Sequence, residues 1–165
     1  MFVRGRKVVS EAIIDSKSIE KYLNTTSDKI NEYVNLATLA AMQSGTLGAQ
    51  GHYANALAAI FIACGQDMAC VSEAAVGITR TELIGRDLYI SVNIPNLIVG
   101  TVGGGTSLPT QRECLEIIGC YGESKANKFA EIIGAAILAG ELSLIASISA
   151  NDFAQAHKKY RKPKK

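Results

Sequence analysis

Large aliphatic residues alternate with polar ones in the middle of the chain. Every second position of residues 87–94 is aliphatic, namely Leu88, Ile90, Val92 and Ile94. This period of two is typical of a strand with one buried face. Short β-rich runs predict further strands at residues 7–14, 75–82 and 96–102, and Gly85 and Pro95 separate the last three of the four strands.

Helical patterns dominate the two ends of the chain. Residues 51–64 place one set of side chains at helical spacing, His52, Asn55, Ala56, Ala59, Ile60 and Ala63, and Gly65 follows as a C-cap. Capping residues and Pro109 predict helices at 16–23, 27–42 and 109–118, a long helix from 125 and a last one over 153–160. Helices at both ends with strands between them predict an α+β fold, with the helices packed on a small mixed sheet.

Residues 132–150 are almost entirely apolar or small, which raises the question of a membrane span. Glu141 lies in the middle of this segment, and a carboxylate at that depth in lipid costs a few kcal/mol. Gly134 and Gly140 suit close helix packing instead. We therefore expect a long buried C-terminal helix, in a core or a subunit interface, and no membrane association.

The composition is that of a globular protein, with 165 residues, 48% hydrophobic and 19% charged. We expect a single domain over residues 1–165. The net charge of +2 gives no reason to expect a nucleic-acid partner. Residues 158–165 hold much of the positive charge, and the simplest interpretation is a solvated basic tail.

The four cysteines, Cys64, Cys70, Cys114 and Cys120, form no close Cys-x-x-Cys pair. The sequence therefore predicts neither a zinc site nor a dithiol redox motif. Basic residues interrupt the start of the chain and no long apolar run follows them, so we expect no secretion signal. A reducing, cytoplasmic compartment is the natural expectation.

Two short segments around the helix at 51–64 contain candidate site residues. The small residues before it leave backbone amides free for an anion, and His52 and Asn55 lie on one helix face. A plain helix start with a satisfied histidine explains the same pattern. Asp67 follows the other end, where an aspartate is usually a turn residue but meets the negative end of the helix dipole.

Two further segments are ambiguous in the same way. The run Gly103-Gly104-Gly105 in residues 100–106 follows an apolar strand, and it fits either a bare turn or a cradle for a ligand. It does not match the Gly-x-Gly-x-x-Gly dinucleotide pattern. His157 titrates near neutrality as any histidine does, and a solvated terminal histidine is the default interpretation.

Taken together and in order, these segments resemble the hydroxymethylglutaryl-CoA reductase family. The blocks that carry the resemblance are Leu88-Tyr89-Ile90-Ser91, Gly100 to Thr106, Leu138 to Leu144, Cys64-Gly65-Gln66-Asp67 and Ala156-His157-Lys158-Lys159. The last block is in a form like the archaeal enzymes. The similarity covers nearly the whole chain and implies the C-terminal part of the family's catalytic domain.

The resemblance implies a reaction and a set of roles. The family reduces 3-hydroxy-3-methylglutaryl-CoA to mevalonate with NADPH and releases coenzyme A, which feeds isoprenoid synthesis. Asp67 and His157 match catalytic residues. Asn55, His52, Tyr22, Leu23 and Asn24 match positions that contact the substrate or its coenzyme A. Residues Val102, Gly103, Gly104, Gly105 and Thr106 match the nicotinamide end of the cofactor site.

The departures from the family pattern are equally specific. The family's catalytic glutamate and lysine and its small NADPH-binding domain lie outside this sequence. Asn24 and Val34 each stand where the family commonly has a lysine, and Cys70 replaces a glutamine.

These differences leave three functions open. The chain is a reductase part that pairs as a homodimer or with an N-terminal reductase chain; a non-catalytic paralogue that binds a coenzyme A ligand or dimerises; or a fragment without its own function.

Overall fold

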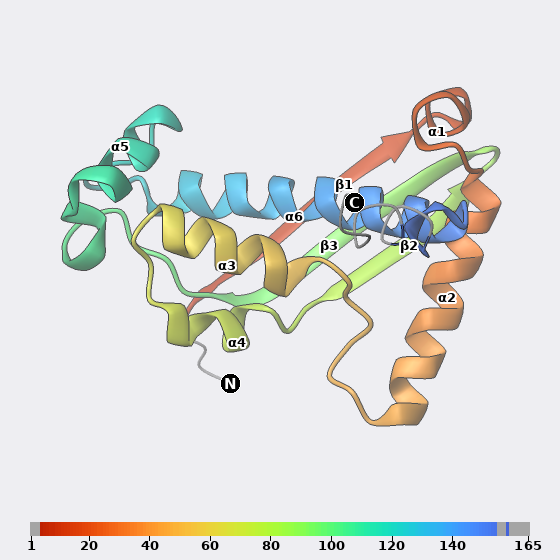
Figure 1. Cartoon of the computed structure of the whole chain (residues 1–165), viewed down its shortest axis with the longest axis horizontal. Helices are drawn as coiled ribbons and strands as arrows, with labels where there is room; N and C mark the ends of the chain where they lie inside the picture. The colour runs from red at the N-terminus through yellow and green to blue at the C-terminus, as the bar shows by residue number, and fades with distance from the viewer. Residues whose placement is uncertain (1–3, 155–157, 159–165) are drawn as a thin grey trace, which may run out of the picture.

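The computed structural model describes residues 4–154 and 158 and confirms the α+β class (Figure 1). In chain order the elements are β1 (Arg6–Ile14), α1 (Ser16–Leu23), α2 (Ser27–Ser44), α3 (Tyr53–Ala63), the short helix η1 (Met68–Cys70), α4 (Val71–Ala74), β2 (Ile78–Ile84), β3 (Asp87–Leu97), the short helix η2 (Gly104–Ser107), α5 (Pro109–Ile117) and α6 (Ala126–Ser149).

The three strands form one sheet in the order β1-β3-β2, and both pairings are antiparallel. The prediction of a mixed sheet was therefore wrong. A two-residue turn joins β2 to β3, with Gly85 at φ +64°, and such a short connection brings the chain back antiparallel. β1 then pairs with the other edge of β3, also antiparallel.

The separate strand predicted at residues 96–102 does not exist, because β3 continues through Pro95 to Leu97. Proline has no N–H to donate, so it is rarely tolerated in a strand that is paired on both sides. At this point, however, β2 has already ended, since its first residue Ile78 pairs with Asn93. The pairing with β1 also shifts register between Arg6 and Val8. The proline therefore lies where pairing is incomplete, and it does not end the strand.

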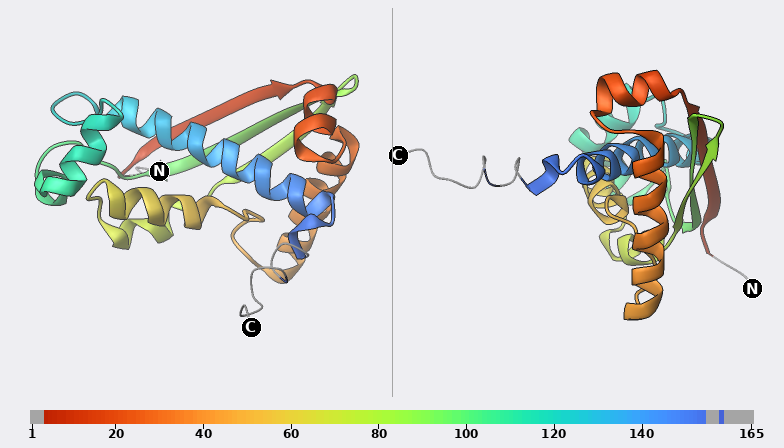
Figure 2. Two further views of the ribbon diagram at one scale, coloured as in Figure 1. Left: turned by 45° about the horizontal axis from the view of Figure 1, so that its top comes forward. Right: turned by 90° about the vertical axis from the view of Figure 1, so that its right-hand side faces the viewer.

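The helices cover one face of the sheet, and α6 runs along it (Figure 2). The aliphatic residues of β3 point into this layer, and Leu88, Ile90, Val92 and Ile94 are fully buried. α6 contributes to both core clusters: Phe129 and Ile133 pack near α3 and β1, and Ile145 packs near α1 and α2. The expectation of a long buried helix is confirmed.

α6 is also the only helix in the described part of the chain that is long and apolar enough to cross a membrane. Length and composition alone are weak grounds for a span, because core helices pass the same test. Gly134 illustrates its packing role here: a Cβ at this position would lie 2.6 Å from the Ser10 hydroxyl and 2.7 Å from Val8 Cγ1. The glycine thus lets α6 approach β1 closely.

Candidate functional site

The loop that carries Asp67 lies directly against the glycine run. α3 ends in a left-handed Gly65 (φ +64°), and the amide of Gln66 donates back to the Phe61 carbonyl at 2.8 Å. A Cβ added to Gly65 would overlap the Gly105 carbonyl, and one added to Gly105 would lie 2.7 Å from the Gly65 oxygen. Two backbones meet here at a distance that only glycine allows on both sides.

Gln66 fixes this junction with its side chain. Its amide nitrogen donates to the carbonyls of Cys64 (2.7 Å) and Gly100 (3.0 Å), and its amide oxygen accepts from the Gly100 N–H at 2.8 Å. Gln66, the residue before Asp67, therefore fixes Gly100, which lies between the end of β3 and the glycine run. The family resemblance assigns Asp67 and the glycine run to one site, and the structure shows that their two segments touch at Gly65 and Gly105.

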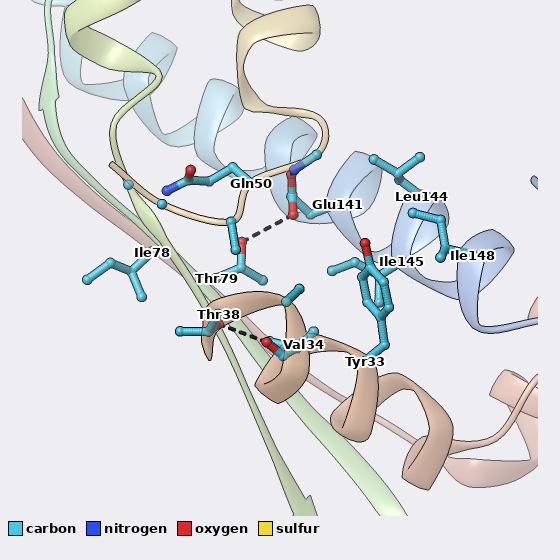
Figure 3. Close-up of a pocket in the computed structure, with 15 residues that line it drawn as sticks. Tyr33, Val34, Thr38, Gln50, Ile78, Thr79, Glu141, Leu144, Ile145 and Ile148 are labelled. Atoms are coloured by element: carbon cyan, nitrogen blue, oxygen red, sulfur yellow. Dashed lines mark hydrogen bonds between the residues drawn. The ribbon is translucent and has the colours of Figure 1, made fainter. Parts of the chain in front are cut away.

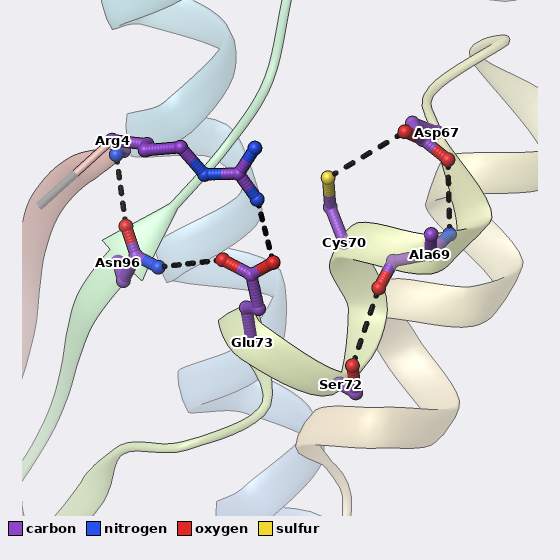
Figure 4. A network of polar contacts seen from close by, with 8 residues as sticks. Arg4, Asp67, Ala69, Cys70, Ser72, Glu73 and Asn96 are labelled. Carbon is purple, nitrogen blue, oxygen red and sulfur yellow. Dashed lines mark hydrogen bonds and ion pairs between the residues drawn. The ribbon is translucent and has the colours of Figure 1, made fainter.

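The Asp67 carboxylate is exposed and caps the next turn (Figure 4). Oδ1 accepts from the Ala69 amide at 3.0 Å, and the Cys70 thiol lies 3.8 Å from Oδ2 as a weak donor. Burial raises the pKa of the Cys70 thiol, and the carboxylates of Asp67 and Glu73 raise it further. The thiol thus stays protonated beside the carboxylate at neutral pH.

A second polar group lies beside this turn. Glu73 accepts from the Arg4 guanidinium at 2.6 Å and from the Asn96 amide at 3.3 Å. Asn96 in turn accepts from the Gly5 N–H at 2.8 Å. These contacts tie the start of β1 and the end of β3 to α4.

The glycine run presents backbone, not side chains, to its surroundings. Gly103 (φ +76°) and Gly104 (φ +53°) both adopt left-handed conformations, and nothing lies within 4 Å of a Cβ built on either. Val102 is 56% exposed. Thr106 is buried, and its hydroxyl donates to the Gly103 carbonyl at 2.6 Å. Among the predicted cofactor residues, the buried Thr106 therefore stabilises the turn, whereas Val102, Gly103 and Gly104 are exposed.

His52 and Asn55 lie at the opposite end of α3. His52 is the N-cap, and its side chain makes no capping hydrogen bond. Asn55 is exposed on the first turn. About 12 Å of helix separates Asn55 from the end of α3, at the usual rise per residue. The described part of one chain does not bring these residues to Asp67.

The anion expected at this helix start is Glu141 of α6. Its Oε1 accepts from the backbone amides of Gly51 (2.9 Å) and His52, and its Oε2 lies 3.2 Å from the Thr79 hydroxyl. Glu141 is 1% exposed. The sequence singled out Glu141 only as an obstacle to membrane insertion, although a carboxylate within an apolar helix is itself a signal for a buried polar partner.

Tyr53 extends this network. It is 1% exposed, and its hydroxyl lies 3.2 Å from the Thr79 hydroxyl. Burial raises the pKa of Tyr53 well above its usual value. Gly77 makes room for the ring, because a Cβ there would lie 2.5 Å from it. Tyr53 is thus a core residue in this chain.

A pocket with an empty volume of about 520 Å³, part of it open to solvent, borders Glu141 (Figure 3). Its walls are mostly apolar and come from α2, β2 and α6. Val34, at the position of a family lysine, is 6% exposed and packs in this wall. The Nε2 atom of Gln50, on the rim, is buried without a protein partner.

The residues predicted to contact coenzyme A lie at the end of α1, apart from both ends of α3. Tyr22 is 71% exposed, and the Lys21 ammonium lies 4.7 Å from its ring centroid. Leu23 packs on the core, and the left-handed Asn24 donates to Asp152 at 3.2 Å. His157 lies outside the described residues. Within residues 4–154 and 158, no three side chains gather in a way that would hold a metal ion.

Comparison with known proteins identifies the family. The sequence model of hydroxymethylglutaryl-coenzyme A reductase matches residues 1–162. Among curated 3-hydroxy-3-methylglutaryl-coenzyme A reductases, that of Methanocaldococcus jannaschii is 48% identical over 155 residues, which is 93% of this chain and 38% of the relative. That of Aeropyrum pernix is 50% identical over 161 residues, with the same coverage of 93% and 38%.

A plant relative, 3-hydroxy-3-methylglutaryl coenzyme A reductase 1 of Cannabis sativa, is 42% identical over 98% of this chain and 30% of its own length. The chain therefore belongs to the hydroxymethylglutaryl-coenzyme A reductase family. It spans about 38–40% of the length of the archaeal relatives that it matches.

Proposed function

We propose that this chain supplies part of the active site of a 3-hydroxy-3-methylglutaryl-CoA reductase, which reduces its thioester substrate to mevalonate. The observation that supports the proposal is the backbone contact between Gly65 and Gly105, through which the loop that carries Asp67 meets the exposed glycine run. An enzyme that adds hydride to a carbonyl needs polar groups at the developing oxyanion next to the hydride donor.

The exposed glycines fit the reactive end of NADPH. Gly103 and Gly104 leave open space over the backbone, so a flat ring can approach it closely. NADPH would supply the hydride. Val102, Gly103, Gly104 and Gly105 would hold its nicotinamide end, and Thr106 would keep the turn in shape.

The chain's own side chains would then bind and move protons. Asp67 would orient a lysine and a glutamate supplied by another part of the enzyme, and its own capping bond to Ala69 would keep the carboxylate in place. His157 would protonate the departing coenzyme A thiolate. His52 and Asn55 would contact the substrate, and Tyr22, Leu23 and Asn24 the coenzyme A.

Those of these residues that the structure describes occupy three separate places, so a partner or a further part of the same protein would complete a site. Either a second copy or an N-terminal reductase chain would bring the missing groups. α2 offers an apolar surface for such a partner, because Leu36, Leu39 and Met42 are each more than 50% exposed. All four cysteines are free, which agrees with a reducing, cytoplasmic location.

Complementation tests the proposal. The purified chain is mixed with the separately produced N-terminal portion of the Aeropyrum pernix relative, and NADPH oxidation is followed with and without 3-hydroxy-3-methylglutaryl-CoA. We expect substrate-dependent oxidation in the mixture, a loss of about a hundredfold or more in Asp67→Asn, and full activity in the exposed control Asp28→Asn. Equal rates for Asp67→Asn and wild type would contradict the role of Asp67.

A second function, that of a non-catalytic paralogue, is favoured by the residues at the two positions where the family commonly has a lysine. Val34 is buried in the core, and the Asn24 side chain is bonded to Asp152, so neither presents a cation to coenzyme A. A non-catalytic paralogue that binds a coenzyme A ligand or dimerises would tolerate both changes. Calorimetry with coenzyme A and light scattering separate the cases: no binding and a polydisperse, aggregating chain would indicate a fragment without its own function.

A further inference from the structure

The start of α3 is fixed by a residue that is remote in sequence. His52 is the N-cap, yet the chain near it provides no side-chain cap. Helix starts leave amide donors without partners, and burying them unpaired is costly. Glu141, 89 residues further along the chain, accepts from two of them, those of Gly51 and His52.

The carboxylate is held from its other side as well. Oε2 lies 3.2 Å from the Thr79 hydroxyl, which also lies 3.2 Å from the Tyr53 hydroxyl. A hydroxyl has one hydrogen, so Thr79 donates either to the carboxylate or to the Tyr53 hydroxyl, and not to both at once. The described residues form no ion pair with Glu141. Its charge is therefore compensated by backbone and hydroxyl donors and by the positive end of the α3 dipole.

The imidazole of His52 is positioned by the residue next to Glu141. A Cβ built on Gly140 would overlap the His52 ring at Cδ2 and Nε2. The ring therefore occupies the place that a side chain at Gly140 would fill, and any larger residue there would displace it. Adjacent residues of α6 thus fix both the backbone and the ring of His52.

We propose that Glu141 and Gly140 are positioning residues for His52, and that α6 sets the direction in which the imidazole meets a substrate. The importance of this for binding rests on the proposed function, in which His52 contacts the substrate. The positioning itself is a property of this chain and is measurable without any ligand.

The first experiment observes the His52 ring by proton–carbon NMR in the chain alone. The sequence has two histidines, so His157→Gln leaves one ring signal and assigns it. We expect Gly140→Ala and Glu141→Ala to shift this signal clearly. Glu141→Gln keeps an acceptor oxygen for the amides and is expected to retain most of the wild-type position. Ile133→Val, a buried change elsewhere on α6, is the control and should leave it unchanged.

An unchanged His52 signal in both Gly140→Ala and Glu141→Ala overturns the proposal. So does an equal shift in Ile133→Val, because the signal would then report only general loosening of the core. If Glu141→Ala does not fold, Gly140→Ala and Glu141→Gln still decide between positioning and a merely structural role.

The second experiment measures binding of 3-hydroxy-3-methylglutaryl-CoA to the complemented enzyme by calorimetry. Glu141→Ala is expected to bind about tenfold more weakly, the scale of one lost hydrogen bond, and Glu141→Gln to recover most of that loss. Wild-type protein that binds nothing, with the NMR shifts as expected, refutes the proposed function and leaves the positioning intact. Equal affinities with the NMR shifts present refute the link to substrate.

Discussion

The two ends of α3 present candidate site residues in different ways. At the C-terminal end, backbone meets backbone at Gly65 and Gly105, and Asp67 is exposed. At the N-terminal end, the buried side chains of Glu141 and Tyr53 and the half-buried Thr79 form a hydrogen-bonded network next to His52. The structure of the C-terminal end depends on the absence of side chains, and that of the N-terminal end on a complete set of polar partners. We therefore expect different substitutions to destabilise the two ends.

The largest effect is expected at the glycine contact. Gly65→Ala places a Cβ on the Gly105 backbone and also strains a residue at φ +64°. We expect the free energy of unfolding to fall by about 3 kcal/mol, from overpacking together with the left-handed backbone. Gly45→Ala is the matched control, since Gly45 is left-handed (φ +72°, ψ +19°) but has open space around a Cβ, and it should lose only about 1 kcal/mol. Equal losses in urea unfolding would show that the contact contributes nothing.

The network under His52 is tested by Thr79→Val, which removes a hydroxyl and keeps the shape of the side chain. Glu141 Oε2 and the Tyr53 hydroxyl both lose a neighbour, so we expect a loss of about 2 kcal/mol. Tyr53→Phe removes the hydroxyl that contacts Thr79 and the Asn93 backbone, and should lose about 1–2 kcal/mol. The double variant should lose less than the sum of the two losses, as for residues in one network. Strict additivity in denaturant unfolding would argue against the network.

The exposed end offers a chemical test at Cys70. Its thiol has a raised pKa, caused by burial and then by the Asp67 and Glu73 carboxylates, so at pH 8 less of it is the reactive thiolate. Asp67→Asn removes one negative charge, lowers this pKa, and should speed alkylation about fivefold, on the scale of ~1 kcal/mol between charges in water.

Cys64 is the internal control for the alkylation experiment. Burial raises the pKa of its thiol to about 11, with Cys114 and Cys120 as further contributors, and Asp67 is not among the causes. Fragment-resolved mass spectrometry follows both thiols in one reaction. A Cys70 rate that is unchanged in Asp67→Asn would mean that the carboxylate does not influence the thiol.

The smallest effect is expected for Arg4→Ala. The ion pair with Glu73 is short but its side chains are 71% and 41% exposed, so the loss should be about 0.5 kcal/mol and should vanish in high salt. Asn96→Ala removes contacts to both Gly5 and Glu73 and should lose more. A large loss for Arg4→Ala in thermal unfolding would show that this surface pair stabilises the turn after Asp67.

Much of the fold was predictable because its signals are local. The alternation over residues 87–94 matches β3, Asp15 caps α1 through the Ser18 amide at 2.9 Å, and Pro109 begins α5. Pro95 misled the strand prediction, because its effect depends on which neighbours still pair at that point. Among the site residues, the sequence placed His52 and Asp67 at opposite ends of one predicted helix, but it did not show which distant segments pack beside each end.

The sequence by itself determined most of the helices and strands, the buried face of β3 and, through its motifs, the family. Only the tertiary structure decided that Gly65 lies on Gly105, that Glu141 is the anion at the start of α3, and that Val34 belongs to the core. The physical reason is the distance along the sequence over which each interaction acts. Capping, periodicity and turn conformation act within a few residues, whereas the site depends on contacts that exist only after α6 and the sheet have packed around α3.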